Sequence, residues 1–216
     1  MSAVRKKLAW YDNIPLLSYL LLKGRCRSCQ GKIPSYYFWT EFFTGALFVL
    51  VFWFNWPIIS LSKLVFELIV VSILVFVFLF DALYKEILPG AVWLSLAIVV
   101  GYYFFNRNIF DSAYVYGALL DFLFFAFQYF ISRGRWIGGG DVRYGLFMGA
   151  LLGWEKTVVA LLFAYWLGAL VGLLLIAFKR SKLNSEIPFG TFLTAGTLFA
   201  MYFGEYVVRW YTNIIG

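Results

Sequence analysis

The sequence predicts a polytopic α-helical membrane protein. Hydrophobic residues make up 63% of the 216 residues, charged residues make up only 13%, and the mean hydropathy is +0.82. A water-soluble fold cannot bury so much apolar surface, whereas lipid can cover it. Several apolar runs reach the ~20 residues that span a bilayer. Because lipid offers the backbone no hydrogen bonds, these runs are expected to be helices.

Seven apolar runs are expected to form membrane helices, and polar or basic residues separate them. In chain order they are Tyr37–Trp56, Lys63–Tyr84, Leu88–Phe105, Ser112–Ser132, Asp141–Trp154, Lys156–Phe178 and Ile187–Trp210. The fifth run is too short to cross comfortably, unless the bilayer thins or its glycine-rich lead-in dips inside the protein. Residues 1–36 are expected to form a basic cytoplasmic segment, and residues 37–216 one transmembrane domain.

The positions of Lys and Arg indicate that the N-terminus lies inside the cell, because cytoplasmic loops are enriched in these residues. Thirteen lie in the segments that this topology places inside: Arg5, Lys6, Lys7, Lys23, Arg25, Arg27, Lys32, Lys85, Arg133, Arg135, Lys179, Arg180 and Lys182. Four lie outside: Lys63, Arg107, Lys156 and Arg209. Orientation therefore explains the net charge of +7 better than a nucleic-acid partner does. Residues 5–7 are interpreted as topology determinants, with contact to anionic lipid headgroups as the alternative.

The segment Trp136–Arg143 carries the first functional candidate. Gly138, Gly139 and Gly140 lead directly into Asp141, which opens the fifth apolar run. Successive glycines let another chain or a buried group approach closely. An acid at the edge of the hydrocarbon is costly and is therefore a candidate for function. Capping of the helix by Asp141 is an equally good interpretation of this segment alone.

A second acid, Asp81, favours the functional interpretation. It ends the apolar run Leu68–Phe80, and the predicted topology places it at the cytoplasmic face with Asp141. Two carboxyl groups in one partly dehydrated site can share a proton near neutral pH. One can then accept a proton from a water molecule that attacks a peptide carbonyl, while the other donates a proton. The chain has no histidine, which excludes Ser–His and Cys–His catalysis.

Six motifs, in this order, resemble those of the bacterial type IV prepilin peptidases, a family of GxGD intramembrane aspartyl proteases. They are Trp10–Tyr19 for W-x-D-N-I-P-x-L-S-[WY], Gly24–Cys29 for R-C-x-x-C, Ile33–Gly45 for Y-x-x-[VW]-E-x-x-[TG]-G, Asp81–Pro89 for D-x-x-x-x-x-I-P, Gly138–Asp141 for G-x-G-D and Ile187–Gly190 for I-P-F-G. Leu88 stands between Ile87 and Pro89 in the fourth motif. Together the motifs extend along nearly the whole chain.

The resemblance implies an enzyme of the bacterial inner membrane that cleaves the basic leader from prepilins and pseudopilins at the cytoplasmic face. Asp81 and Asp141 match the catalytic aspartates, and Gly138–Gly140 would let the substrate backbone lie beside the acid. Proteolysis would need no cofactor. Many members then N-methylate the new N-terminus with S-adenosylmethionine. The implied partners are the substrates and the lipid bilayer, and a homo-oligomer stays open.

The chain departs from the family pattern at three points. The usual form has one more transmembrane helix and one more C-x-x-C before the first motif, whereas only Met1 and the eight residues Ser2–Ala9 precede Trp10 here. Cys26 and Cys29 are the only cysteines, so a four-thiolate zinc site cannot form within one chain. The two cysteines are either part of a zinc site that other ligands complete or spare thiols. Whether the chain methylates its product stays an open question. Third, Arg143 stands where the family usually has lysine.

For each of two further acidic residues, the sequence allows two interpretations of its role. Glu41 either stabilises the start of a helix through its dipole or takes part in methyl transfer. Asp121 falls in the middle of its helix, where it either makes a polar contact between helices or contributes to activity. Two other classes of function also remain: a GxGD protease of the preflagellin or signal-peptide-peptidase type, and a non-catalytic transport or assembly protein. In the last case Asp81 and Asp141 would lie far apart.

Overall fold

A computed structural model describes residues 9–57, 60–106, 111–178 and 187–215. The basic residues at 5–7, 107, 179, 180 and 182, which entered the orientation argument, lie outside these ranges. Within the described part the regular structure is helical, with one isolated β-bridge. The predicted all-α class is therefore confirmed. The chain divides into two compact units, Met1–Leu64 and Val65–Gly216, here called the N-terminal unit and the helical unit.

The N-terminal unit contains two short helical turns, a hairpin and one long helix. A 3₁₀ turn at Trp10–Asn13 precedes α1 (Leu17–Leu21), and α2 covers Ser35–Asn55. The hairpin between α1 and α2 is held by the antiparallel bridge of Arg25 with Lys32. Pro34 lies directly before the first residue of α2. Because proline has no N–H and a fixed φ, it suits this position.

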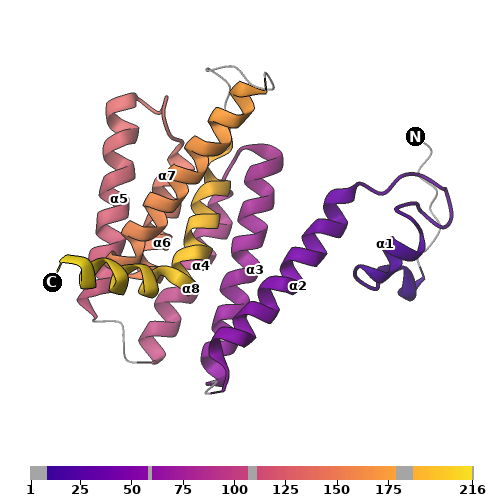
Figure 1. Cartoon of the computed structure of the whole chain (residues 1–216), viewed down its shortest axis with the longest axis horizontal. Coiled ribbons are helices and arrows are strands. Elements are labelled where there is room, and N and C mark those ends of the chain that lie inside the picture. Colours follow the sequence, from indigo (N-terminus) through magenta and orange to yellow (C-terminus); the bar gives the residue numbers. More distant parts are fainter. Residues whose placement is uncertain (1–8, 58–59, 107–110, 179–186, 216) are drawn as a thin grey trace. The chain divides into compact units, whose positions relative to one another are not determined.

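The described part of the helical unit consists of six helices, which Figure 1 shows. They are α3 (Leu61–Tyr84, of which Val65 onward belongs to this unit), α4 (Pro89–Phe105), α5 (Ser112–Ser132), α6 (Gly139–Leu152), α7 (Trp154–Ala177) and α8 (Phe189–Ile215). Local chemistry fixes their ends. Asp111 caps α5 by accepting a hydrogen bond from the Ala113 N–H at 3.0 Å. Gly153, at φ 76°, separates α6 from α7.

Four described helices are long and apolar enough to cross a membrane: α2, α3, α5 and α7. α4 is apolar but shorter. Among the described residues, α6 and α8 do not reach the combination of length and hydropathy that a membrane span requires. The seven expected runs correspond to α2–α8 in the described part of the chain, and the fifth, α6, is short as expected, but α6 and α8 are less apolar than the four candidate spans. The reason lies in burial. α6 contacts α4, α5, α7 and α8, so protein covers it on several sides and its sequence needs fewer lipid-compatible side chains.

α5 and α6 cross with their backbones in direct contact. A Cβ on Gly117 would lie 2.6 Å from the Gly149 carbonyl oxygen, and a Cβ on Gly149 would overlap the Gly117 backbone. Small residues at helix crossings allow this approach in membrane proteins. Around the crossing, the fully buried side chains of Phe125, Tyr144 and Met148 fill the core of the helical unit.

Candidate active site

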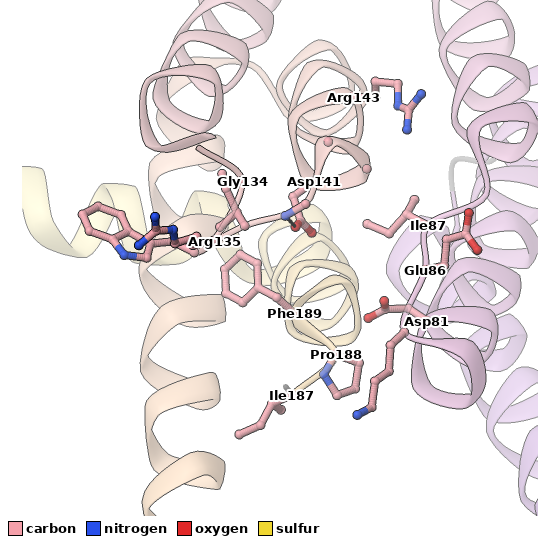
Figure 2. Close-up of a pocket in the computed structure, with 16 residues that line it drawn as sticks. Asp81, Glu86, Ile87, Gly134, Arg135, Asp141, Arg143, Ile187, Pro188 and Phe189 are labelled. Atoms are coloured by element: carbon pink, nitrogen blue, oxygen red, sulfur yellow. Dashed lines mark hydrogen bonds between the residues drawn. The ribbon is translucent and has the colours of Figure 1, made fainter. Parts of the chain in front are cut away.

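A cavity of about 420 Å³ lies in the helical unit, and both predicted catalytic aspartates line it. Its walls come from the end of α3, the α3–α4 connection, the α5–α6 connection with the start of α6, and the start of α8. Figure 2 shows the carboxyl groups of Asp81 and Asp141 entering the same space from different walls, with Phe189 on a further side. The structure thus brings together two acids that are far apart in sequence.

Asp81 is held by the first turn of α8. Its side chain is buried, with 3% exposed, and its Oδ2 accepts a hydrogen bond from the Thr191 backbone N–H at 2.7 Å. Thr191 is the third residue of α8, and its N–H is one of those that no carbonyl of the same helix can accept. The positive end of the α8 dipole therefore faces Asp81 and stabilises negative charge there.

Asp141 is held by its own helix. It is the third residue of α6, and its Oδ2 accepts a hydrogen bond from the Gly138 N–H at 2.8 Å. The carboxyl group is 7% exposed and lines the cavity. The capping interpretation and the cavity interpretation of this acid are therefore compatible, because one oxygen caps the helix while the side chain remains at the cavity wall.

Glycines keep the space around the acids free. A Cβ on Gly190 would lie 2.9 Å from the Asp81 Cγ, and a Cβ on Gly140 would lie 3.0 Å from the Ile87 Cβ. Real Cβ atoms essentially never sit at the first of these separations, so a side chain at Gly190 would displace the Asp81 carboxyl group. Gly138, Gly139 and Gly140, the predicted loop residues, all line the cavity.

The rest of the cavity wall carries charges of both signs. Lys85, Arg135 and Arg143 line it together with Glu86. Arg143, a predicted secondary residue, thus reaches the site, and its buried Nε has no hydrogen-bond partner among the described residues. Figure 2 shows Arg143 on the α6 side and Glu86 on the α3 side. A substrate segment with charged groups can therefore be bound close to the acids.

Asp121 does not belong to this cavity. It lies within α5, its side chain is 0% exposed, and neither carboxyl oxygen has a hydrogen-bond partner in the described part of the chain. The neighbouring Tyr144 hydroxyl is occupied by a hydrogen bond with the Thr197 hydroxyl at 3.0 Å. The predicted polar contact of Asp121 between helices is therefore not formed as a hydrogen bond with any described residue.

Glu41 has a local structural role within the N-terminal unit. α2 begins at Ser35, so Glu41 is its seventh residue and lies beyond the first turn, where the dipole acts. The interpretation that it stabilises the helix start is wrong for this reason. Its Oε2 instead accepts a hydrogen bond from the Leu16 N–H at 2.7 Å. This contact ties the turn before α1 to α2.

The two cysteines lie in the hairpin of the N-terminal unit and are free. The backbone N–H groups of Cys29 and Ser28, together with the Cys29 thiol, hydrogen-bond to Cys26 and lower the pKa of its thiol. No group of three or more Cys, His, Asp or Glu side chains gathers around a common point within the described ranges. Two thiols do not complete the four-ligand set of a structural zinc site, so this donor set does not fit zinc.

Sequence reasoning missed Thr191 and Ile87 as parts of the site. The I-P-F-G motif gave a signal, because Pro188 and Gly190 mark the start of a helix, and the N–H groups of such a start attract a carboxylate. Nothing in the local sequence, however, says which carboxylate it is. The Asp81–Thr191 hydrogen bond joins positions 110 residues apart, and only the tertiary structure, which brings the end of α3 to the start of α8, determines it.

Comparisons with known proteins identify the family of the chain. Residues 2–55 match the Bacterial Peptidase A24 N-terminal domain, and residues 68–173, which include both aspartates, match the Type IV leader peptidase family. The chain is 32% identical over 210 residues to the prepilin leader peptidase/N-methyltransferase of Legionella pneumophila, covering 94% of this chain and 71% of the relative.

Relatives with the same description occur in other bacteria. Identity is 31% over 217 residues with that of Aeromonas salmonicida strain A449 (94% of this chain, 70% of the relative) and 28% over 225 residues with that of Bacillus subtilis strain 168 (97% and 83%). No solved structure matches the chain. The identities and the family match, together with two acids on one cavity between apolar helices, lead to one conclusion: the chain belongs to the type IV leader peptidase family.

Proposed function

We propose that the chain is an aspartic endopeptidase that removes the basic leader from type IV prepilins and pseudopilins at the cytoplasmic face of the bacterial inner membrane. The observation that carries the proposal is the common cavity of Asp81 and Asp141. Family membership and the names of the relatives, all prepilin leader peptidase/N-methyltransferases, support the choice of substrate.

In the proposed reaction the two aspartates share one proton. The ionised carboxylate accepts a proton from water, and the resulting hydroxide attacks the carbonyl carbon of the scissile peptide bond. The protonated carboxyl group donates its proton to the carbonyl oxygen, which gives a tetrahedral intermediate. Collapse of the intermediate breaks the C–N bond: the leaving amine takes a proton from the acid that accepted one first, and a hydroxyl of the intermediate returns a proton to the other aspartate, which restores the shared proton. No cofactor takes part in these steps.

A helix start holds each of the two catalytic carboxyl groups in the same way. Asp81 accepts the Thr191 N–H in front of α8, and Asp141 accepts the Gly138 N–H at the start of α6. Each carboxyl group uses one oxygen, Oδ2, for its hydrogen bond and keeps Oδ1 for water or substrate. Gly138–Gly140 leave room for the substrate backbone beside Asp141, and Arg143 binds a polar group of the substrate segment.

The membrane orientation belongs to the same proposal. The bias of Lys and Arg toward alternate connections supports a cytoplasmic position for the cavity. In the proposed organisation, residues 1–36 are a cytoplasmic segment and residues 37–216 form the protease domain. Methylation of the new N-terminus with S-adenosylmethionine is part of the relatives' names and stays open for this chain, because the two-cysteine hairpin does not complete a zinc site.

A cleavage assay tests the proposal. The full chain is reconstituted in lipid vesicles with a prepilin that carries its basic leader, and mass spectrometry of the product identifies the new N-terminus. Wild type is expected to cut once before the apolar helix, with or without S-adenosylmethionine. Asp81→Asn and Asp141→Asn are expected to lose cleavage and keep the thermal stability of wild type.

A substrate panel separates the proposal from its rivals. A preflagellin and a signal peptide are offered beside the prepilin under the same conditions. Preference for either of these over the prepilin would replace the substrate assignment with another GxGD protease. Normal prepilin cleavage by either aspartate variant would overturn the catalytic assignment itself.

A further inference from the structure

The N-terminal unit contains a second cavity, which the proposed function does not use. It has a volume of about 440 Å³ and lies between the end of α1, the hairpin and the start of α2. Lys23, Arg25 and Lys32 line it, and no acidic residue of the described part of the chain does so. The cavity therefore has three positive charges around one space.

Backbone hydrogen bonds hold these cations in place. Arg25 and Lys32 form an antiparallel bridge pair, and the Ile33 N–H donates to the Gly24 carbonyl at 2.8 Å. Gly24 has φ +67°, and a Cβ there would lie 2.9 Å from the Tyr19 hydroxyl oxygen. The Tyr19 ring thus packs directly on the hairpin. The fold therefore sets the backbone positions of the three basic residues, whose side chains are exposed at the cavity.

The positive charges of the cavity are not neutralised within the described residues. Lys23, Arg25 and Lys32 form no ion pair with any of them, whereas Arg27 in the same hairpin donates from its Nε to Asp12 at 2.9 Å and lies over the Tyr11 ring. A cluster of like charges costs free energy unless an anion binds between them. The hairpin therefore contains one satisfied cation beside three that lack a counter-charge.

The start of α2 adds to the positive potential. Ser35, its first residue, lines the cavity, and the free N–H groups and the dipole of this 21-residue helix favour an anion there. α2 is also one of the helices that can cross a membrane. A cavity at the polar end of a membrane helix lies at the depth of the lipid headgroups.

We propose that this cavity binds the phosphate of an anionic phospholipid headgroup. Three cations and a helix start match a phosphate diester, and the position at the start of α2 favours a lipid over free phosphate. S-adenosylmethionine fits less well. Its sulfonium and amino groups are cationic, and the cavity offers them three like charges and no carboxylate side chain. The inference goes beyond the proposed proteolysis and does not depend on it.

Lipid binding by the full chain tests the proposal. The detergent-purified chain is titrated with phosphatidylglycerol and, in parallel, with phosphatidylcholine, and native mass spectrometry measures the apparent affinity of the retained lipid. We expect a clear preference for phosphatidylglycerol. Lys23→Gln/Arg25→Gln/Lys32→Gln should lower its affinity on the order of a hundredfold, from roughly 1 kcal/mol per basic residue near an anionic lipid, or about fivefold for each.

Arg25→Gln and Arg27→Gln provide the matched comparison. The two residues are of one type and lie two positions apart in the hairpin, but only Arg25 lines the cavity. Arg25→Gln should weaken binding about fivefold, by the same charge argument, and Arg27→Gln should leave it within about twofold. The charge-preserving variant Lys23→Arg/Arg25→Lys/Lys32→Arg should bind like wild type. If the triple glutamine variant does not fold, the matched pair decides.

Several outcomes would overturn the proposal. Equal loss in Arg25→Gln and Arg27→Gln would mean that general charge, and not the cavity, attracts the lipid. Unchanged binding by a folded triple glutamine variant would also exclude the site. Displacement of the lipid by inorganic phosphate at comparable concentration would overturn the lipid as the source of the phosphate. Displacement by S-adenosylmethionine would assign the cavity to that ligand.

Discussion

The three buried aspartates of the helical unit differ in what surrounds them. Asp81 and Asp141 lie at a cavity, and each accepts a backbone N–H from the start of a helix. Asp121 lies in the middle of α5, where its two carboxyl oxygens have no hydrogen-bond partner among the described residues. The first two acids line a space that can admit water or substrate, and the third does not. An acid inside a membrane protein is thus a candidate for catalysis only when it has access to a reaction space.

Glycine has opposite effects at the cavity and at the α5–α6 crossing. At the cavity, Gly140 and Gly190 leave space beside Ile87 and Asp81. At the α5–α6 crossing, Gly117 and Gly149 remove space, because the two backbones touch. The absence of a side chain therefore leaves free space at the helix starts, and it lets the two backbones touch at the helix crossing. The neighbouring elements decide which effect occurs.

The largest expected difference is in cleavage. Asp81→Asn and Asp141→Asn should each lower kcat by about a thousandfold or more, since general acid and base contributions are of the order of 10² to 10⁴ each. Asp121→Asn should stay within about threefold of wild type, because Asp121 does not line the cavity. Single-turnover prepilin cleavage measures all three. A loss in Asp121→Asn equal to the other two would remove the distinction between the regions.

The second prediction concerns the α5–α6 crossing. Gly149→Ala places a Cβ inside the Gly117 backbone and should destabilise the helical unit by about 3 kcal/mol or more, as overpacking at a rigid contact does. Gly101→Ala, in α4, is the matched control, because nothing lies within 4 Å of its Cβ position. It should stabilise slightly through helix propensity. Denaturant unfolding in mixed micelles compares the two, and equal effects would contradict the close crossing.

The third prediction separates the backbone from the side chain at Thr191. Thr191→Pro removes the N–H that donates to Asp81, and a first-turn residue of α8 can accept proline. Loss of a hydrogen bond to a charged group, about 1.5–3 kcal/mol, should lower kcat roughly ten- to a hundredfold. Thr191→Val keeps the N–H and should stay within about threefold. The pH dependence of kcat should also change in Thr191→Pro only, and an unchanged profile would reduce Thr191 to a structural role.

The smallest expected effect is on stability. Asp121→Asn replaces an unpartnered carboxyl group with an uncharged side chain of similar shape, which costs less to bury. The apparent Tm should rise, by an amount equivalent to about 1 kcal/mol. Asp81→Asn and Asp141→Asn each remove a charge that a helix start stabilises, so neither should raise the apparent Tm. A lower Tm for Asp121→Asn would indicate a partner for Asp121 that stabilises the acid.

Most of the helices could be read from the sequence because lipid demands long apolar runs. The expected spans 63–84 and 112–132 agree with α3 and α5 to within two residues. The ends of the interior helices were harder to predict. α6 begins at Gly139 and not at Asp141, and α8 extends from Phe189 to Ile215, past the expected end at Trp210. Both are covered in part by other helices, so hydropathy defines their ends poorly.

The sequence by itself determined the class of the protein and the motifs of the family, and it predicted that Asp81 and Asp141 lie at the same face of the membrane. Apolar length, charge bias and spacing are local properties, and they suffice to place two helix ends on one side of a membrane. Only the tertiary structure decided that Thr191 binds Asp81, that Asp121 has no partner among the described residues, and that three cations surround one cavity. These features depend on how separate segments pack, and packing distances are not encoded in any single segment.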